Sequence, residues 1–208
     1  MYLPDHFCEE DAAEIAALIA AFPLAAVVAT TADGLVANHI PLIADGETAL
    51  IGHIALANDL HRSLADGAEV LAIFRGEDGY ISPNLYPTKA VHHRHVPTWN
   101  YQVVHAHGAI RFRYERKAIM AAVGKLTRQM EDRVSGPNAW RMADAPRDYL
   151  ETMLDAVVAF EIAVDRWQAK SKLSQNRKPE DARGAATALE AAGHDVMACA
   201  MAAVIRKG

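Results

Sequence analysis

The segment from His92 to Gly108, HHRHVPTWNYQVVHAHG, concentrates side chains that can bind ligands. It holds five of the ten histidines and one of the three tryptophans of the chain. Imidazole nitrogens bind metals, an indole packs on planar ligands, and amide and hydroxyl groups orient such ligands. From this segment alone two interpretations stay open: a ligand site around Thr98, Trp99 and Asn100, or a buried strand anchored by the tryptophan.

The histidines of this segment do not follow a metal-binding pattern. His92 and His93 are neighbours that would point to opposite sides of an extended chain, and with His95 they match no zinc spacing. His105 and His107 alternate along a predicted strand and share one of its faces. We therefore expect loop and strand histidines here and predict no metal site.

Two further segments have the chemistry of an anion site. GHIALAN, residues 52–58, ends a predicted strand and begins a helix that Asn58 can cap, and free N–H groups at a helix start bind phosphate. KLSQNR, residues 172–177, offers many donors that could clamp an anion. The alternatives are a capped strand-to-helix junction and a solvated basic turn. Nucleophile, Walker-loop and paired-carboxylate motifs are absent from the sequence, so covalent hydrolase chemistry has no support.

Composition limits the classes of protein to consider. The 208 residues are 51% hydrophobic, carry a formal charge of −5 and include two cysteines. This favours one domain with terminal additions in a reducing compartment, and the acidic N-terminus does not resemble a signal peptide, so we expect a cytoplasmic protein. The charge argues against a globally basic nucleic-acid-binding surface. A local basic patch is the best candidate for DNA contact, although a solvated face explains it as well: Arg111, Arg113, Arg116 and Lys117.

The periodicity of the chain predicts the elements that position these segments. Three strands at 24–30, 35–44 and 48–56, joined by Asp-Gly turns, form an antiparallel meander. Further strands are predicted at 68–76, 101–114 and 159–170, with a turn, short strand and loop at 76–86. Helical patterns follow Asp11, Glu115 and Asp148. We therefore predict an α+β fold, an antiparallel β-barrel or sheet with peripheral helices and an Ala-rich helical C-terminus: a domain over 1–178 and a helical extension over 179–208 packed on it.

Eight segments of the chain resemble the PaiB-type proteins, known as FMN-binding negative transcriptional regulators. VPTWNY at 96–101 and KLSQNR at 172–177 are the most specific of them. The others run in register along the chain: MYLPDHF at 1–7, NHIPL at 38–42, GHIALAN at 52–58, VLAIFRG at 70–76, YISPNLY at 80–86 and VHAHG at 104–108.

The resemblance implies a split β-barrel like that of pyridoxamine 5′-phosphate oxidases, working as a homodimer with FMN in the cleft between subunits. It places His39 and Pro41 beside the flavin, residues 52–55 with Asn58 around the ribityl phosphate, and residues 99–101 near the ring, with KLSQNR closing the site. The residues it nominates for the cofactor are Asn38, His39, Pro41, Gly52, His53, Ile54, Ala55, Asn58, Thr98, Trp99, Asn100, Tyr101, Lys172, Ser174, Gln175, Asn176 and Arg177.

A flavin site does not by itself decide the function, because this kind of barrel hosts oxidases, reductases and flavin-sensing regulators. The resemblance favours a flavin-dependent negative regulator of transcription, although we see no helix-turn-helix pattern. The alternative is an FMN-dependent oxidoreductase without direct DNA binding, for which no residue can be named as the general acid from sequence.

Overall fold

The computed structural model describes residues 1–207, and its contacts divide them into two compact units. Unit 1 comprises Met1–Ile15, Arg75–Val104 and the chain from Gln168 onward; unit 2 comprises Ala16–Phe74 and His105–Trp167. Three long strands each contribute a part to both units: β5 (Glu69–Ile81), β6 (Thr98–Arg113) and β7 (Val157–Lys172). The two units are described separately below.

The predicted meander is present at the start of the barrel. β2 (Leu24–Thr31), β3 (Gly34–Ala44) and β4 (Ala49–Ala55) pair antiparallel in sequence order, with tight turns between them. Gly34 and Gly46 have positive φ angles of 108° and 74°, a conformation that glycine adopts without steric cost, as both Asp-Gly turns require.

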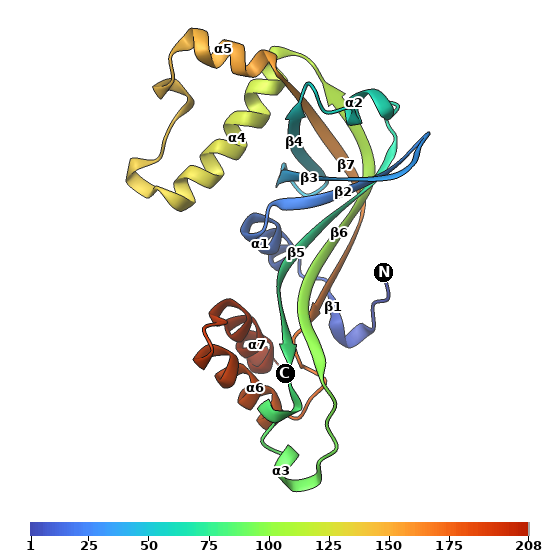
Figure 1. The fold of residues 1–208 in the computed structure, drawn as a ribbon, viewed down its shortest axis with the longest axis vertical. Helices are drawn as coiled ribbons and strands as arrows, with labels where there is room; N and C mark the ends of the chain where they lie inside the picture. The colour runs from blue at the N-terminus through green and yellow to red at the C-terminus, as the bar shows by residue number, and fades with distance from the viewer. Residues whose placement is uncertain (208) are drawn as a thin grey trace. The chain divides into compact units, whose positions relative to one another are not determined.

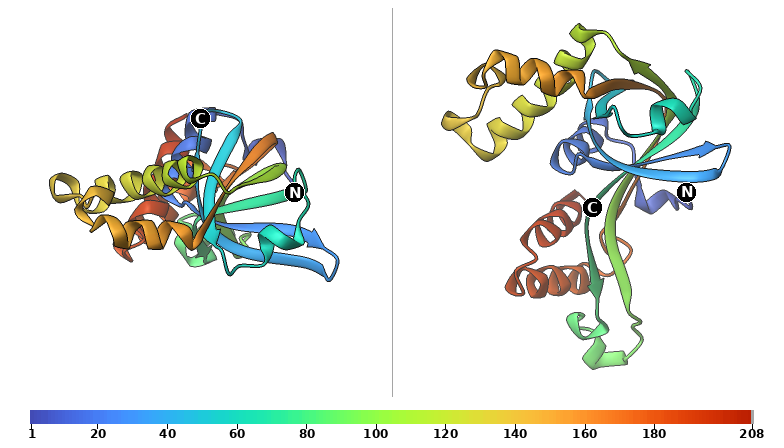
Figure 2. Two further views of the ribbon diagram at one scale, coloured as in Figure 1. Left: turned by 90° about the horizontal axis from the view of Figure 1, so that it is seen from above. Right: turned by 45° about the horizontal axis from the view of Figure 1, so that its top comes forward.

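The seven strands follow the order β1-β7-β4-β3-β2-β5-β6, and a further pairing of β7 with β6 closes the sheet into a barrel. β1 (Cys8–Glu9) pairs antiparallel with β7 at Lys170 and Ala169. Figure 2 shows how β2 and β3 curl as part of the barrel. The predicted α+β antiparallel barrel is confirmed, because β1–β7, β2–β3, β2–β5, β3–β4 and β4–β7 all pair antiparallel and the helices lie outside the sheet.

The helices largely follow the sequence pattern. In unit 2, α4 (Arg116–Val134) and α5 (Arg147–Asp155) lie side by side and bury Ile119, Ala122 and Leu154, and α2 (Leu60–Ser63) is a single turn. α1 (Ala12–Ala21) is capped by Asp11, whose Oδ1 accepts from the N–H of Ala13 at 2.9 Å. No helix within residues 1–207 has both the length and the apolar character that crossing a membrane requires.

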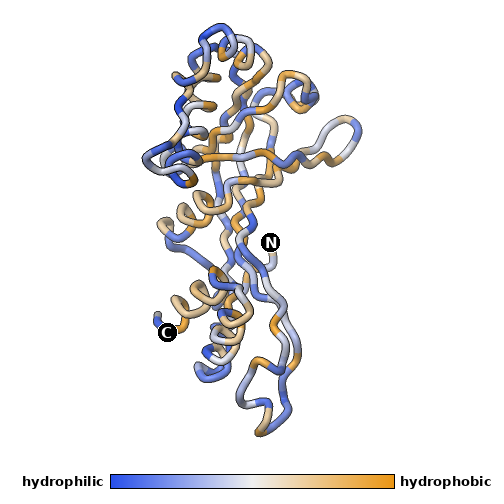
Figure 3. The backbone as a smooth tube through the Cα atoms, turned by 60° about the vertical axis from the view of Figure 1, so that its left-hand side comes forward, coloured by the Kyte–Doolittle hydropathy of each residue, from blue (hydrophilic) through white to orange (hydrophobic). Residues whose placement is uncertain are grey.

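Unit 1 contains the two C-terminal helices, α6 (Pro179–Ala191) and α7 (Asp195–Lys207), side by side in Figure 1. Pro179 starts α6 as predicted, and the two helices are separated at Gly193, which has a φ of 83°. Figure 3 shows long apolar stretches in this pair. These stretches enclose a core of Ile81, Tyr86, Leu173, Ala185, Leu189, Met197 and Met201.

The predicted turn at 76–79 is wrong, because β5 continues without interruption to Ile81. The polar residues that suggested a turn have partners along this strand. Glu77 accepts a hydrogen bond from the backbone N–H of Met197 at 3.1 Å, and Arg75 pairs with Asp78. Gly79 is not among the residues with positive φ, so its backbone makes no turn. The short helix α3 (Lys89–His92) follows later in the same unit.

Candidate functional site

The KLSQNR segment begins as the end of β7 and then turns sharply. Lys172 is the last residue of the strand, and Ser174 has a φ of 68°, which is unusual for a residue with a side chain. The side chain of Gln175 stabilises the turn through two hydrogen bonds: its Oε1 accepts from the N–H of Leu173 at 2.7 Å, and its Nε2 donates to the carbonyl of Ser171. The backbone of the turn is therefore fixed by its own side chains.

Asn100 supports the same turn from β6. It is fully buried, its Nδ2 donates to Ser174 Oγ at 2.9 Å, and Ser174 Oγ donates back to Asn100 Oδ1 at 3.3 Å. The same Nδ2 lies 3.4 Å from the sulfur of Met201. Both polar atoms of this buried amide are thus used within unit 1, which gives Asn100 a structural role in holding Ser174 in its left-handed conformation.

Two lysines from the end of β7 lie among aromatic rings. Lys170 is only 6% exposed; its Nζ donates to the carbonyl of Tyr2 at 3.1 Å and lies 5.3–5.9 Å from the ring centroids of Tyr2, Phe7 and Tyr101. This is the geometry of cation–π contacts.

Lys172, two residues further, shares the same side of the strand. Its Nζ donates to Thr98 Oγ1 and to the carbonyl of Trp99, and lies 5.9 Å from the Phe7 ring centroid. Burial, with the neighbouring charges of Lys170 and Arg177, lowers the pKa of Lys172. Within residues 1–207, none of these three cations forms an ion pair with a carboxylate.

An exposed aromatic pair lies next to this basic segment. Trp99 and Tyr80 are 53% and 52% exposed, and their rings meet edge to face with centroids 6.0 Å apart. Large aromatic side chains this exposed offer a flat apolar surface to a ligand. The structure therefore brings Thr98 and Trp99 together with Lys172, as one group in unit 1.

The predicted site residues on β3 and β4 form a second group, in unit 2. Asn58 donates to Asn38 Oδ1 at 2.9 Å, while its own Oδ1 accepts from the N–H of Leu60, the first residue of the short helix α2, at 3.0 Å. His39 is exposed on β3. His53 has a buried Nδ1 without a hydrogen-bond partner, and burial lowers its pKa.

Gly52 and Ile54 serve the packing of the barrel. Ile54 belongs to the buried core. Gly52 lies between Leu42 on β3 and Phe160 on β7, and a Cβ atom there would lie 2.6 Å from Leu42 Cδ2 and 2.7 Å from Phe160 Cζ. The close approach of these two side chains explains why position 52 holds a glycine. Pro41 is partly buried, and Ala55 is exposed at the end of β4.

The loop histidines are not equivalent. The His95 side chain is 6% exposed, its Nε2 lies 2.8 Å from Thr88 Oγ1, and its Nδ1 has no partner. Thr88 Oγ1 donates to the carboxylate of Asp181 on α6, which is also buried. His92 contacts the His95 ring. Among residues 1–207 no group of three or more His, Cys, Asp or Glu side chains is arranged to hold a metal ion.

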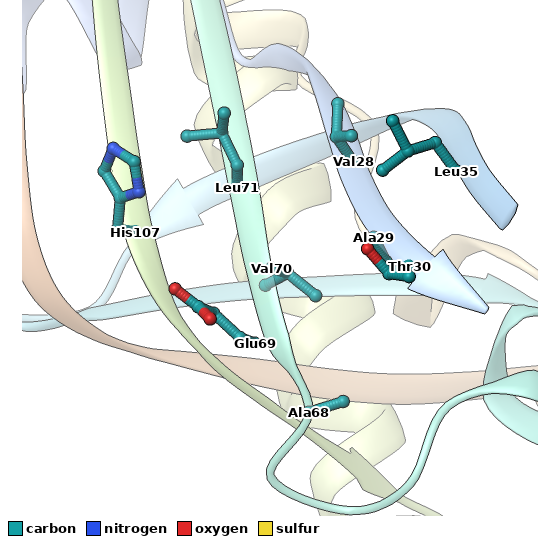
Figure 4. A pocket seen from close by; sticks show the side chains of 9 residues that line it. All are labelled: Val28, Ala29, Thr30, Leu35, Ala68, Glu69, Val70, Leu71 and His107. Carbon is teal, nitrogen blue, oxygen red and sulfur yellow. The ribbon is translucent and has the colours of Figure 1, made fainter. Parts of the chain in front are cut away.

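Sequence reasoning missed Lys170 and an open hollow in unit 2. Lys170 and Lys172 are two residues apart on a strand, so they share one face, and this spacing was a signal that Lys170 belongs with Lys172. The hollow, of about 340 Å³, lies over β2 and β5 and carries the side chains of Glu69 and His107 at one side (Figure 4). Leu35, at its edge, is 78% exposed. The apolar lining of the hollow comes from residues of two strands that do not form a sequence motif: Val28, Ala29, Val70 and Leu71.

The predicted basic patch is partly neutralised. Arg116 forms an ion pair with Asp155 at 3.0 Å, and Arg113 lies 3.9 Å from a carboxylate oxygen of Glu161. Arg111 and Lys117 are exposed. Two of the four cations thus already have acidic partners within unit 2.

The amino-acid sequence was compared with family models and with known proteins. Residues 1–166 match the family model described as "Putative FMN-binding domain". The chain is 32% identical over 184 residues to "Protease synthase and sporulation protein PAI 2" of Bacillus subtilis (strain 168), covering 87% of this chain and 85% of that protein. It is 30% identical over 205 residues to an uncharacterized protein of Emericella nidulans, covering 82% and 80%.

The fold is also similar to that of a solved structure, the FAD and heme binding protein from Mycobacterium smegmatis. The TM-score is 0.58 at 20% identity, and the match covers 79% of this chain and 73% of that chain. At this identity the similarity concerns the fold alone. The family model and the Bacillus relative each span most of the chain, and the chain therefore belongs to the PaiB-type family of FMN-binding domains.

Proposed function

We propose that this chain binds FMN, with the basic end of β7 and the exposed aromatic pair of unit 1 as part of the site. One observation carries the proposal: Lys170, Lys172 and Arg177 have no carboxylate partners within residues 1–207, and Lys172 is hydrogen-bonded to the backbone of an exposed tryptophan. Cations that lack internal counter-charges favour an anionic ligand. Membership of the FMN-binding family supports the choice of flavin.

The residues present fit the chemistry of FMN. A flavin mononucleotide combines a phosphate, which needs several N–H donors, with a flat apolar ring system, which packs on an aromatic face. Lys172 and Arg177 supply donors, and Trp99 with Tyr80 supplies the face. When bound, FMN supplies hydride and single-electron transfer at its ring. The residues of unit 2 named by the resemblance, His39, Pro41 and Asn38 among them, remain proposed contacts.

Titration of the protein with FMN, followed by flavin fluorescence, tests the proposal. Trp99→Ala should weaken FMN binding by about 1–3 kcal/mol, the range of an aromatic stacking contact, which is about 5-fold to 150-fold. Trp140→Ala is the matched control, because Trp140 is 43% exposed and belongs to unit 2, whereas Trp99 and the basic end of β7 belong to unit 1. Equal losses in both variants would count against the aromatic pair as a flavin contact.

We also propose that the chain acts as a homodimer, with FMN at the subunit interface. The exposed Leu35 and the hollow beside it offer an apolar surface on unit 2 that a second copy could cover. Sedimentation of the wild-type chain and of Leu35→Asp tests this. A dimer that the substitution dissociates supports the proposal, and a wild-type monomer at all concentrations argues against it.

A role as a flavin-responsive negative regulator of transcription completes the proposal. Its support is the family resemblance and the name of the Bacillus relative, "Protease synthase and sporulation protein PAI 2". A gel shift with promoter DNA at several salt concentrations, with and without FMN, tests it. No binding at low salt, together with bleaching of bound FMN by reduced nicotinamide under anaerobic conditions, would instead favour the oxidoreductase.

A further inference from the structure

We propose that the outer face of the C-terminal helix pair, α6 and α7, is an interaction surface whose partner is a second copy of this chain. On this surface the helix pairs of two copies pack face to face and antiparallel. The surface shares no residue with the proposed flavin site, and it lies outside residues 1–166, the part of the chain that matches the family model. Membership of the family therefore does not account for it.

An open groove of about 570 Å³ is lined by residues of both helices. Three short side chains, Ala186, Ala198 and Ala202, contribute to its lining, and the first two are buried. Other faces of the same helices cover the core of unit 1 through Leu189 and Met201. The remaining groove residues are Arg183, Thr187, Glu190, Asp195, Cys199, Ile205 and Arg206. Short side chains let a helix of another molecule approach closely, so the groove suits a helical partner.

The charged residues of the groove are divided between its two ends. Glu190 and Asp195 flank the turn that joins the helices, in which the N–H of Gly193 donates to the carbonyl of Glu190 at 2.9 Å. The helices run antiparallel from this turn (Figure 1), and Arg183 and Arg206 lie further along them. At about 1.5 Å per residue, each arginine is about 10–16 Å from the acidic residue of its own helix. The groove thus has an acidic end and a basic end.

This division of charge is self-complementary, because a two-fold dimer uses the same surface of both copies. An axis that lies in the interface at right angles to the helices places Asp195 opposite Arg206 of the second copy. The same axis places Glu190 opposite Arg183 of the second copy. An axis parallel to the helices would place the two acidic ends together, and like charges across an interface cost free energy. The charges therefore select the antiparallel arrangement, while contact between the two groove linings removes apolar surface from water.

Cys199 lies where it can report on this arrangement. It is an exposed free cysteine, four residues after Asp195 and seven residues before Arg206, and so it lies near the middle of α7. In the antiparallel dimer α7 packs on α7 of the second copy, which brings the two Cys199 side chains close to the two-fold axis. The axes of packed helices are about 8–10 Å apart, so a short bismaleimide linker should join the two thiols.

Sedimentation of the full chain, with Leu35→Asp in every variant, tests the proposal. This substitution removes association through the hollow of unit 2, and the remaining self-association should give a concentration-dependent dimer. The matched control is Arg94→Glu with Lys178→Glu, because both residues are exposed in unit 1 and neither lines the groove. The control should dimerise as strongly as the parent chain.

Two charge reversals within the groove should each weaken the dimer by about tenfold or more, because like charges then face one another. One is Arg183→Glu with Arg206→Glu, and the other is Glu190→Arg with Asp195→Arg. An equimolar mixture of the two variants should dimerise again, since the acidic groove of one complements the basic groove of the other. In a Cys8→Ser background, bismaleimide should cross-link the parent chain through Cys199 and should not cross-link either variant alone.

Each contrary result overturns the proposal. A parent chain that stays monomeric at all concentrations removes the surface, and a dimer that both groove reversals leave intact places the contact elsewhere. An equal loss in the control assigns the effect to net charge. A mixture that stays monomeric although circular dichroism shows both variants folded, or a dimer without a Cys199 cross-link, contradicts the antiparallel pairing. None of these substitutions lies in the proposed flavin site, so FMN titration tests that function separately.

Discussion

Replacing Gly52 with alanine separates a packing role from a ligand-binding role for this residue. Gly52 is paired with Leu42 on one side and Phe160 on the other, and both side chains are buried. An added Cβ would lie 2.6 Å and 2.7 Å from their carbon atoms, where ordinary contact begins at 3.4 Å. Both neighbours must therefore move by several tenths of an ångström within a filled core. Overpacking of this kind costs about 1–3 kcal/mol.

Thermal unfolding in the absence of flavin measures this cost. For a chain of this size, 1–3 kcal/mol corresponds to a decrease in Tm of about 2–12 °C. Gly79→Ala is the control, because a Cβ at position 79 meets no atom within 4 Å and the residue has no positive φ; its Tm should change by less than about 2 °C. A Gly52→Ala variant that is as stable as the wild-type chain, but has lost flavin affinity, would refute the packing argument.

Three further predictions concern the buried polar groups. Burial alone would raise the pKa of Asp181, but the hydrogen bonds from Thr88 lower this pKa below the ordinary value of 3.8. The ionised carboxylate therefore stabilises the fold at pH values above 3.8. This stabilisation is lost as the pH falls through the lowered pKa. Asp181→Asn should cost about 2–4 kcal/mol at pH 7 and flatten the pH dependence of urea unfolding between pH 5 and 2, whereas parallel profiles would contradict this. Ser174→Gly should be about 1 kcal/mol more stable than Ser174→Ala in denaturant unfolding, because both lose the bond to Asn100 but only glycine relieves the positive φ; equal stabilities would argue against strain at this position. Burial lowers the pKa of His53, so the unfolded chain takes up this proton first and stability should fall as the pH drops below 6.5 toward the folded-state pKa; His53→Leu should show a smaller fall between pH 7.5 and 5.5, and an unchanged fall would assign it to other groups.

Local signals in the sequence sufficed for much of the fold. The two Asp-Gly turns and the alternation around them predict β2 to β4, and Pro179 with Gly193 delimits α6. The error at β5 has a tertiary cause. Glu77 is typical of a turn in the sequence, but its carboxylate accepts a hydrogen bond from the N–H of Met197, which lies 120 residues later in the chain.

The candidate site was less predictable, because some residues of a motif support the fold while others of the same motif are available to a ligand. Asn100 and Ser174 look like ligand contacts in a sequence, yet each is the other's partner in the core of unit 1. Lys172 and Trp99 were identified by their motifs, and the structure adds the hydrogen bond between them. The burial of His95 against Thr88 and Asp181 depends on a helix that begins more than 80 residues later. No local pattern encodes such a pairing.

The visible absorbance spectrum of the purified chain, before and after addition of excess FMN and removal of the unbound flavin, tests the central claim most directly. We predict flavin absorbance that stays with the protein at up to one FMN per chain, and that decreases in Trp99→Ala but not in Trp140→Ala. A folded chain that remains colourless after this treatment, and that does not change the fluorescence of added FMN, would contradict the assignment of unit 1 as part of a flavin site.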